Sequence, residues 1–307
     1  MRTKWYCDTL LTNGVFPKFS NGRVDKPSVE FEKIHLIVEE SNMKKIAFFD
    51  IDGTMVNVPN GMMHPSSETI RVITEFKNQG NYIVVASARG SVPESVKNIN
   101  FDGYILNDGH YILFDHEILV DDLHTTEEIT RQINLYDNYD GCYSFGGHAK
   151  EWCSHLDHPL MVDHLKMFQG IDTRPIGVIE EYSASDVEAV SCCAMFNHVD
   201  DLVQCYSELK DDFTAVPYYS GLIRMDVYHK GFTKGTACEY LYKKLNIDRM
   251  DVYAFGDGDN DTEMLQLVGH GIAMGNASDE IKKYASEVTD SVDHDGIAQA
   301  FKKHFDI

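Results

Sequence analysis

The stretch Met43-Lys44-Lys45-Ile46-Ala47-Phe48-Phe49-Asp50-Ile51-Asp52-Gly53-Thr54 decides the fold of this chain. Its apolar run, 46–49, is typical of a buried parallel strand, and acidic residues follow at the carboxyl end of that strand. Two carboxylates one residue apart can divide the work of covalent catalysis, because one attacks while the other transfers protons. The stretch therefore predicts a strand that carries a nucleophile, Asp50, and a general acid and base, Asp52.

Strands and helices alternate on both sides of a central interruption. Ser66 and Ser67 can cap a helix whose apolar residues Ile70, Ile73 and Phe76 share a face. Further elements are predicted as strands at 82–86, 103–106, 251–255 and 271–274, and as helices at 93–98, 234–245, 262–268, 279–285 and 296–305. This alternation predicts an α/β fold with a doubly wound, Rossmann-like parallel sheet, whose ligand chemistry lies at the carboxyl ends of the strands.

The interruption, residues 124–226, has a different pattern. A capping box at 125–128 opens a helix with Ile129, Ile133 and Tyr136 on one face, and strands are predicted at 189–196, 213–219 and 222–228 with a helix at 200–209. We therefore expect a catalytic core of residues 43–123 and 227–307, with an inserted α+β cap domain of residues 124–226.

Residues 1–42 carry six acidic and six basic residues without a sustained periodicity. Codons for Glu39-Glu40 can be purine-rich and would lie where a bacterial ribosome-binding sequence sits before Met43. We therefore expect Met43 to be the true start, with a genuine N-terminal extension as the alternative. Deletion of residues 1–42 should then leave activity and melting temperature nearly unchanged.

Charge and composition exclude several classes of protein. The net charge of −22 argues against nucleic-acid binding and against adhesion to anionic membranes. No apolar run approaches the ~20 residues of a membrane span, and no signal-peptide pattern opens the chain. The seven cysteines have no paired metal-type spacing, so they predict reduced thiols in a cytoplasmic protein.

A second acidic motif, Gly256-Asp257-Gly258-Asp259-Asn260-Asp261, follows another predicted strand. Its oxygen ligands suit an octahedral Mg²⁺ ion, which a carboxylate nucleophile needs to approach a phosphate dianion. Lys234, at the start of a predicted helix, is the candidate cation. Ser87, at the end of its strand, is the candidate hydroxyl that binds phosphate.

With these motifs in this order, the chain from Met43 onward resembles the haloacid dehalogenase superfamily of phosphatases, and more closely its Cof-type branch. Further likeness lies in Thr233-Lys234-Gly235-Thr236-Ala237, in Glu263-Met264-Leu265 and in Ala273-Met274-Gly275-Asn276-Ala277 followed by Asp295-Gly296. One departure is Ser87-Ala88-Arg89, where the family usually has Thr-Gly-Arg. The hydroxyl group is kept, but Ala88 gives the backbone less freedom than glycine.

The resemblance implies a Mg²⁺-dependent hydrolase of small phosphomonoesters, such as sugar phosphates, that works through an aspartyl-phosphate. The implied catalytic residues are Asp50 and Asp52, and the implied metal ligands are Asp50, Asp257 and the backbone carbonyl of Asp52. The resemblance also implies phosphate or substrate binding by Ser87, Ala88, Lys234 and Asn260, with Asp261 and Thr54 in support. The alternatives are a phosphosugar mutase and a phosphometabolite-binding regulator without catalysis.

Charge along the chain adds an expectation about the substrate. Residues 124–226 hold eighteen acidic and six basic side chains, so the cap repels additional anionic groups. A monophosphate on a neutral, hydroxyl-rich body should therefore be favoured over bisphosphates or nucleoside triphosphates. The alternative is that Arg131, Lys150, Arg174 or Arg224 lines the cap and binds a second anion.

Overall fold

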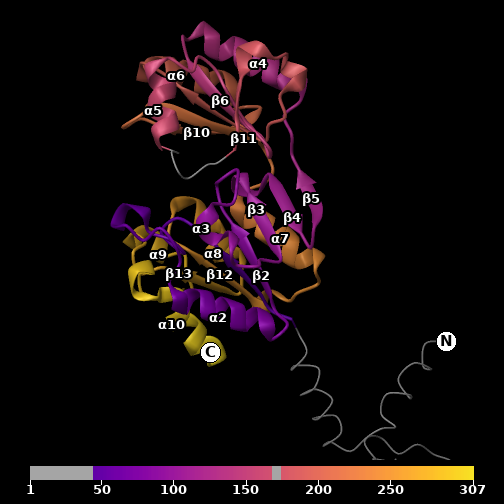
Figure 1. The fold of residues 1–307 in the computed structure, drawn as a ribbon, viewed down its shortest axis with the longest axis vertical. Coiled ribbons are helices and arrows are strands. Elements are labelled where there is room, and N and C mark those ends of the chain that lie inside the picture. Colours follow the sequence, from indigo (N-terminus) through magenta and orange to yellow (C-terminus); the bar gives the residue numbers. More distant parts are fainter. Residues whose placement is uncertain (1–43, 168–173) are drawn as a thin grey trace, which may run out of the picture. The chain divides into compact units, whose positions relative to one another are not determined.

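Strand β1 (Ile46–Phe49) lies in the middle of an eight-stranded sheet, as its apolar sequence predicts. The computed structural model describes residues 44–167 and 174–307, and Figure 1 shows their helices and strands. The chain divides into a unit of residues 1–43 and a unit of residues 44–307. The proposed start at Met43 and the extension 1–42 lie outside the described residues, so both remain predictions.

Parallel pairing dominates this large sheet, whose strand order is β14-β13-β12-β1-β2-β3-β4-β5. Strand β1 pairs with β2 on one side and with β12 on the other, so two segments far apart in the sequence meet at its centre. The other parallel strands are β2 (Tyr82–Ala86), β3 (Gly103–Leu106), β12 (Val252–Gly256), β13 (His270–Ala273) and β14 (Glu287–Val288). The α/β fold class predicted from the sequence is confirmed.

The edge of the sheet differs from the predicted pattern. Strands β4 (Tyr111–Phe114) and β5 (Glu117–Asp121) run antiparallel to their neighbours. Between β3 and β4 the chain reverses within a short turn, in which Asn107 and Asp108 adopt left-handed φ values of 49° and 50°. This turn is too short for the crossover connection that a parallel strand requires. The sheet is therefore parallel through its centre and antiparallel at this edge.

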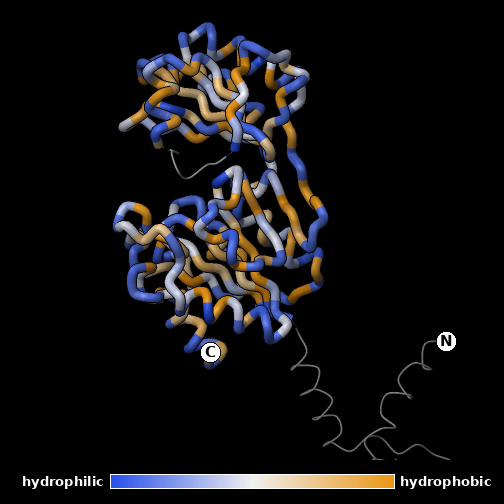
Figure 2. The backbone as a smooth tube through the Cα atoms, in the orientation of Figure 1, coloured by the Kyte–Doolittle hydropathy of each residue, from blue (hydrophilic) through white to orange (hydrophobic). Residues whose placement is uncertain are grey.

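Helices cover both faces of the large sheet, because successive residues of a strand point to opposite faces. Phe49 of β1 packs with residues of helices α2 (Ser67–Asn78) and α10 (Gly296–Phe305). Phe48 packs on the other side with residues of α7 (Lys234–Lys244) and α8 (Thr262–Leu267). Two short helices complete the set: α3 (Glu94–Lys97) lies between β2 and β3, and α9 (Asp279–Lys282) lies between β13 and β14. Figure 2 shows the hydrophobic colouring along the central strands that this double coverage requires.

Helix α2 begins where the sequence predicts, because the Ser66 side chain accepts a hydrogen bond from the backbone N–H of Thr69. Its buried face is made by Val72, Ile73 and Phe76, whereas Ile70 is 36% exposed. The prediction that Ile70 shares the buried face is therefore wrong. The buried face of α2 is rotated away from Ile70, since the helix packs on the sheet through Val72, Ile73 and Phe76.

A second, six-stranded sheet is inserted between β5 and α7, with the order β10-β11-β9-β6-β7-β8. Helices α4 (Thr126–Asn138) and α6 (Val199–Leu209) pack on one of its faces, and α5 (Pro159–Met167) packs with a smaller cluster around Cys142 and Met195. The strands are β6 (Cys142–Gly146), β7 (Glu151–Cys153), β8 (Ile176–Val178), β9 (Ser191–Met195), β10 (Phe213–Tyr218) and β11 (Arg224–His229). Strand β11 extends to His229, three residues past the predicted end of the cap, and the domain bounds remain predictions.

The chain passes between the two sheets after β5 and after β11, and histidines gather at these crossings. The Asp122 carboxylate bonds the Nδ1 atoms of both His110 and His229, each at 2.8 Å. The ring of His124 stacks on that of His229 with centroids 4.5 Å apart. His229 Nε2 also lies 3.1 Å from Glu128 Oε2. A polar and aromatic cluster thus joins the two crossings.

The remaining histidines and cysteines form no common centre within residues 44–167 and 174–307. His148 pairs with Asp121, and His155 pairs with Glu180. Cys192 packs inside the inserted sheet's core, whereas Cys193 faces His164 on the opposite side, as adjacent strand residues must. None of the described helices combines the length and apolarity that a membrane crossing requires.

Candidate active site

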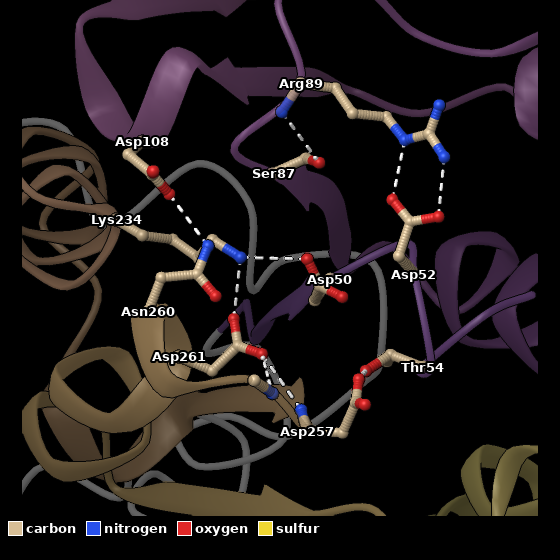
Figure 3. A network of polar contacts seen from close by, with 11 residues as sticks. Asp50, Asp52, Thr54, Ser87, Arg89, Asp108, Lys234, Asp257, Asn260 and Asp261 are labelled. Atoms are coloured by element: carbon tan, nitrogen blue, oxygen red, sulfur yellow. Dashed lines mark hydrogen bonds and ion pairs between the residues drawn. The ribbon is translucent and has the colours of Figure 1, made fainter. Parts of the chain in front are cut away.

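The carboxyl edge of the large sheet brings together the polar residues that the sequence motifs predict (Figure 3). Asp50 follows β1, Ser87 follows β2, and Asp257 follows β12. Because these strands are parallel neighbours, their ends meet at one edge. Lys234 reaches the same place from the first residue of helix α7. Four separate segments of the chain thus supply one polar cluster.

Lys234 is the cation at the centre of this cluster. Its Nζ atom donates to Asp50 Oδ1 at 2.8 Å and to Asp261 Oδ1 at 2.7 Å, and its side chain is fully buried. Burial lowers the pKa of Lys234, but the attraction of Asp261 and Asp50 outweighs burial and raises the pKa above its ordinary value. The lysine therefore stays charged and holds the Asp50 carboxylate in place.

Asp257 is held by two side chains from other segments. Thr54 Oγ1 donates to Asp257 Oδ1 at 2.9 Å, and Asn276 Nδ2 donates to Asp257 Oδ2 at 3.2 Å. Asn276 Nδ2 also donates to the backbone carbonyl of Gly53 at 2.8 Å. Asn276 thus ties the turn after β1 to the turn that carries Asp257.

Gly53 is required at this turn for two reasons. Its φ of +83° lies in the left-handed region, and a Cβ atom there would lie 2.0 Å from Asp257 Oδ2. A larger residue would therefore displace the carboxylate that Thr54 and Asn276 orient.

Asp50, Asp257 and Asp261 form an acidic triad whose candidate ligand atoms all lie within 4.8 Å of one another. Burial raises the pKa of Asp50 well above its ordinary value, because the attraction of Lys234 does not offset burial and Asp261 adds repulsion. Burial, followed by repulsion from Asp261, raises the pKa of Asp257 to about 6 despite the Thr54 hydrogen bond. Lys234 supplies a single positive charge beside these three carboxyl groups. The oxygen ligands of the triad are the type that binds hard divalent cations. The residues present therefore fit a metal ion.

Asp261 differs from the other two members because both of its oxygens are already engaged. Oδ1 accepts from Lys234, and Oδ2 accepts the backbone N–H groups of Asp257 and Gly258, each at 2.9 Å. Asp261 therefore orders the loop that presents Asp257.

Asp52 lies at the more exposed side of the cluster and is paired with Arg89. Arg89 Nε donates to Asp52 Oδ2 at 2.6 Å, and Nη2 donates to Oδ1 at 2.5 Å. The Asp52 side chain is 48% exposed, so it can meet solvent or a substrate. The bidentate geometry fixes the orientation of this carboxylate.

The predicted phosphate-binding residues occupy different positions around this centre. Ser87 is buried, and its Oγ accepts the backbone N–H of Arg89 at 3.2 Å, whereas Ala88 is exposed. Asn260 is also exposed, and its Nδ2 donates to Asp108 Oδ1 at 2.9 Å. Ser87 and Asn260 thus flank the buried Asp50–Lys234 pair within the same network.

A pocket of about 720 Å³ opens beside Asp52 and Arg89. Core residues such as Ala88, Gly90 and Asn107 line one side, and residues of the inserted sheet line the other. The volume lies within the usual range of small-molecule sites. The pocket can therefore hold a small molecule next to Asp52 and Arg89.

Comparison with known proteins identifies the family. A family model described as haloacid dehalogenase-like hydrolase matches residues 47–301. The chain belongs to this family. YkrA of Bacillus subtilis (strain 168), named as an inferred phosphatase, is 28% identical over 266 residues, covering 84% of this chain and 97% of YkrA. The agreement confirms the resemblance stated above.

Two further relatives of this haloacid dehalogenase-like hydrolase are named phosphatases. The 5-amino-6-(5-phospho-D-ribitylamino)uracil phosphatase YcsE of Bacillus subtilis (strain 168) is 26% identical over 274 residues, covering 86% of this chain and 96% of YcsE. The solved structure of the HAD subclass IIB sugar phosphatase BT4131 has a TM-score of 0.70 at 25% identity, covering 86% of this chain and 99% of that one. The family and these relatives identify the chain as a phosphatase enzyme.

Sequence reasoning missed three residues of this candidate site: Arg89, Asn276 and Asp108. Arg89 and Asn276 belong to motifs quoted above, Ser87-Ala88-Arg89 and Ala273-Met274-Gly275-Asn276-Ala277. Their place in these motifs could have marked them as site residues. Asp108 carried no such signal, since its contact with Asn260 joins residues 152 positions apart.

Proposed function

We propose that this phosphatase hydrolyses phosphomonoesters of small metabolites with Mg²⁺, through an aspartyl-phosphate formed on Asp50. The observation that carries the proposal is the buried Asp50 carboxylate, which is bonded to Lys234 through Oδ1 and lies beside Asp257. One oxygen is thereby oriented by the lysine, while the other can attack phosphorus. Lys234 also offsets the negative charge that phosphate brings into the site.

The proposed reaction has two steps. The Asp50 carboxylate forms a bond to phosphorus while the ester P–O bond breaks, and Asp52 gives a proton to the departing alcohol. Asp52 then takes a proton from water, whose oxygen attacks phosphorus, and the bond between phosphorus and Asp50 breaks. Inorganic phosphate leaves, Asp50 is again a carboxylate, and Asp52 again carries the proton with which it began.

A Mg²⁺ ion would be held by the carboxylates of Asp50 and Asp257 and by the backbone carbonyl of Asp52. When bound, it supplies positive charge that reduces the repulsion between Asp50 and the phosphate group. Asp261 does not compete for this role, because Lys234 and two backbone N–H groups already occupy its oxygens. Thr54 supports the site through its bond to Asp257.

Arg89 adds a requirement to this mechanism. Asp52 accepts two hydrogen bonds from Arg89, whereas a general acid must carry a proton toward the leaving oxygen. An arriving phosphate is a competing anion for the guanidinium group. We therefore propose that Arg89 releases Asp52 when substrate binds and then donates its hydrogen bonds to the substrate phosphate. Ser87, Ala88 and Asn260 are the other groups that would bind the phosphate or the substrate.

The substrates that we propose are sugar phosphates or similar hydroxyl-rich monophosphates in the cytoplasm. Relatives named for sugar phosphates and for a phosphorylated ribitylaminouracil support this choice. The cysteines within residues 44–167 and 174–307 are thiols and not disulfides, which supports a reducing compartment.

The test is phosphate release by the full chain with Mg²⁺ from a panel of phosphorylated metabolites. Asp50→Asn should release no phosphate and should melt near the wild-type temperature, because the change removes the attacking charge with little change in volume. Excess EDTA should abolish release, and returned Mg²⁺ should restore it. Substantial turnover by Asp50→Asn, or full activity in EDTA, would refute the proposal. A requirement for a bisphosphate activator with little free phosphate would instead indicate a phosphosugar mutase.

A further inference from the structure

The inserted sheet presents a polar face to the pocket. Of three consecutive strand residues, Arg224 and Asp226 line the pocket, while Met225 between them is fully buried beneath the helices. Ser144, Ser191 and Cys193 line the same face from β6 and β9. Strand alternation thus gives this sheet one face for its hydrophobic core and another for a ligand.

Each arginine of this pocket has a carboxylate beside it. Arg174 Nη2 lies 2.6 Å from Glu151 Oε2, and Arg224 Nε lies 3.9 Å from Asp226 Oδ1. Arg89 is paired with Asp52 in the bidentate geometry described above. Lys166 also lines the pocket, and it pairs with Asp163 at 3.0 Å. Each positive charge of the lining therefore has a carboxylate beside it, so the pocket away from Lys234 offers little net attraction to a second phosphate.

The Arg224–Asp226 pair is the loosest of these three. Its separation of 3.9 Å exceeds hydrogen-bond length, and Arg224 instead stacks on the Tyr218 ring, with Cζ 3.9 Å from the centroid. Burial raises the pKa of Asp226 even though Arg224 opposes the shift. The Asp226 carboxylate also accepts hydrogen bonds from Cys193 and Tyr218, and a carboxylate has about four acceptor positions. Asp226 and the N–H groups of Arg224 therefore keep hydrogen-bonding capacity for a ligand.

A further donor lies at the core side of the pocket. Only 3% of the surface of Asn107 is exposed. Its Nδ2 atom has no hydrogen-bond partner among residues 44–167 and 174–307. Its Oδ1 atom accepts from Ser191 Oγ at 3.2 Å, which turns the amide toward the inserted sheet. A buried donor without a partner is costly, so a ligand oxygen would stabilise it.

On the basis of the proposed phosphatase function, we infer that this pocket recognises an uncharged, hydroxyl-rich leaving group, with Asp226 and Arg224 as specificity-determining residues. Hydroxyl groups both donate and accept, so they can satisfy Asp226, Arg224 and Asn107 together. A second phosphate would instead face the carboxylate of Asp226 at close range. Asp226 therefore selects monophosphates over bisphosphates.

The test compares three esters with the full chain and Mg²⁺ at fixed ionic strength: a hexose monophosphate, a hexose bisphosphate and nitrophenyl phosphate, which lacks hydroxyl groups on its body. We expect the wild type to have a kcat/KM for the hexose monophosphate that is about tenfold or more above its kcat/KM for each of the other two esters. Asp226→Asn should lower kcat/KM for that ester by about tenfold and improve the bisphosphate relative to it. Hydrolysis of nitrophenyl phosphate should stay within about twofold, which also reports that the variant is folded.

The matched control is Asp200→Asn, which removes an exposed carboxylate from α6 on the opposite face of the inserted sheet. It should leave all three values unchanged. A wild-type preference for the bisphosphate, or equal losses on hexose monophosphate and nitrophenyl phosphate in Asp226→Asn, would overturn the inference. Failure of the wild type to release phosphate from any of the esters would refute the proposed function itself.

Discussion

Replacement of Lys234 by methionine tests the charge balance of the site through stability alone. Lys234 is fully buried and contacts Asp50 and Asp261 at 2.8 and 2.7 Å. Methionine keeps much of the side-chain volume but leaves two buried carboxylates without their cation. Breaking a buried pair in this way costs about 3–5 kcal/mol. For a folded unit of this size that corresponds to a fall in melting temperature of roughly 6–20 °C.

The assay is thermal unfolding of the wild type and the variant with and without Mg²⁺. Added Mg²⁺ should recover part of the loss, because a bound cation restores positive charge among the carboxylates. Lys243→Met is the matched control, since Lys243 is on the same helix but is 62% exposed and pairs with Glu239 at the surface. Its melting temperature should change by less than about 2 °C. A Lys234→Met variant that melts within that range of the control would refute the reasoning.

Three other predictions address different parts of the molecule. Asp52→Asn should still form covalent phosphoenzyme but turn over about 10²–10⁴-fold more slowly, measured by trapping labelled phosphate on denatured protein; unchanged turnover would contradict its role. Gly53→Ala should weaken Mg²⁺ binding in calorimetry, because its Cβ would lie 2.0 Å from an Asp257 oxygen; wild-type affinity would contradict this reading. Burial, helped by repulsion from His229, lowers the pKa of His124 to about 4. The unfolded state therefore binds more protons between pH 6.5 and 4, and the free energy of unfolding falls as the pH falls through that window. Denaturant titrations should show this loss reduced in His124→Phe, and identical acid limbs would argue against it.

Much of the fold could be predicted because the decisive signals are local. The apolar run before Asp50 marks a buried strand, and Ser66 marks the start of α2 at a position that the structure reproduces. The antiparallel strand β4 could not be predicted in the same way. Its direction depends on left-handed backbone at Asn107 and Asp108, and these residue types tolerate that conformation without requiring it.

In the candidate site, too, some features could be predicted from local sequence and others could not. Asp50, Asp257 and Lys234 could be placed at one edge because each follows a strand or begins a helix, and such positions converge in a parallel sheet. The partners of these residues could not be deduced from spacing. Asn276 reaches the Gly53 carbonyl across 223 positions, and only the folded backbone brings the two together.

The strand order also constrains how the protein can be made. Strand β1 is completed early in synthesis, but Ile46 pairs with Val252 of β12, which leaves the ribosome only after the whole inserted sheet. Until then one edge of the apolar β1 has no partner, and such an edge is a template for pairing with other chains. The same delay separates Asp50 from Lys234, so a chain interrupted after the inserted sheet carries Asp50 without the lysine that pairs with it. Protection of this nascent edge is therefore a requirement of the topology, and completion of the sheet and assembly of the active site are a single late event.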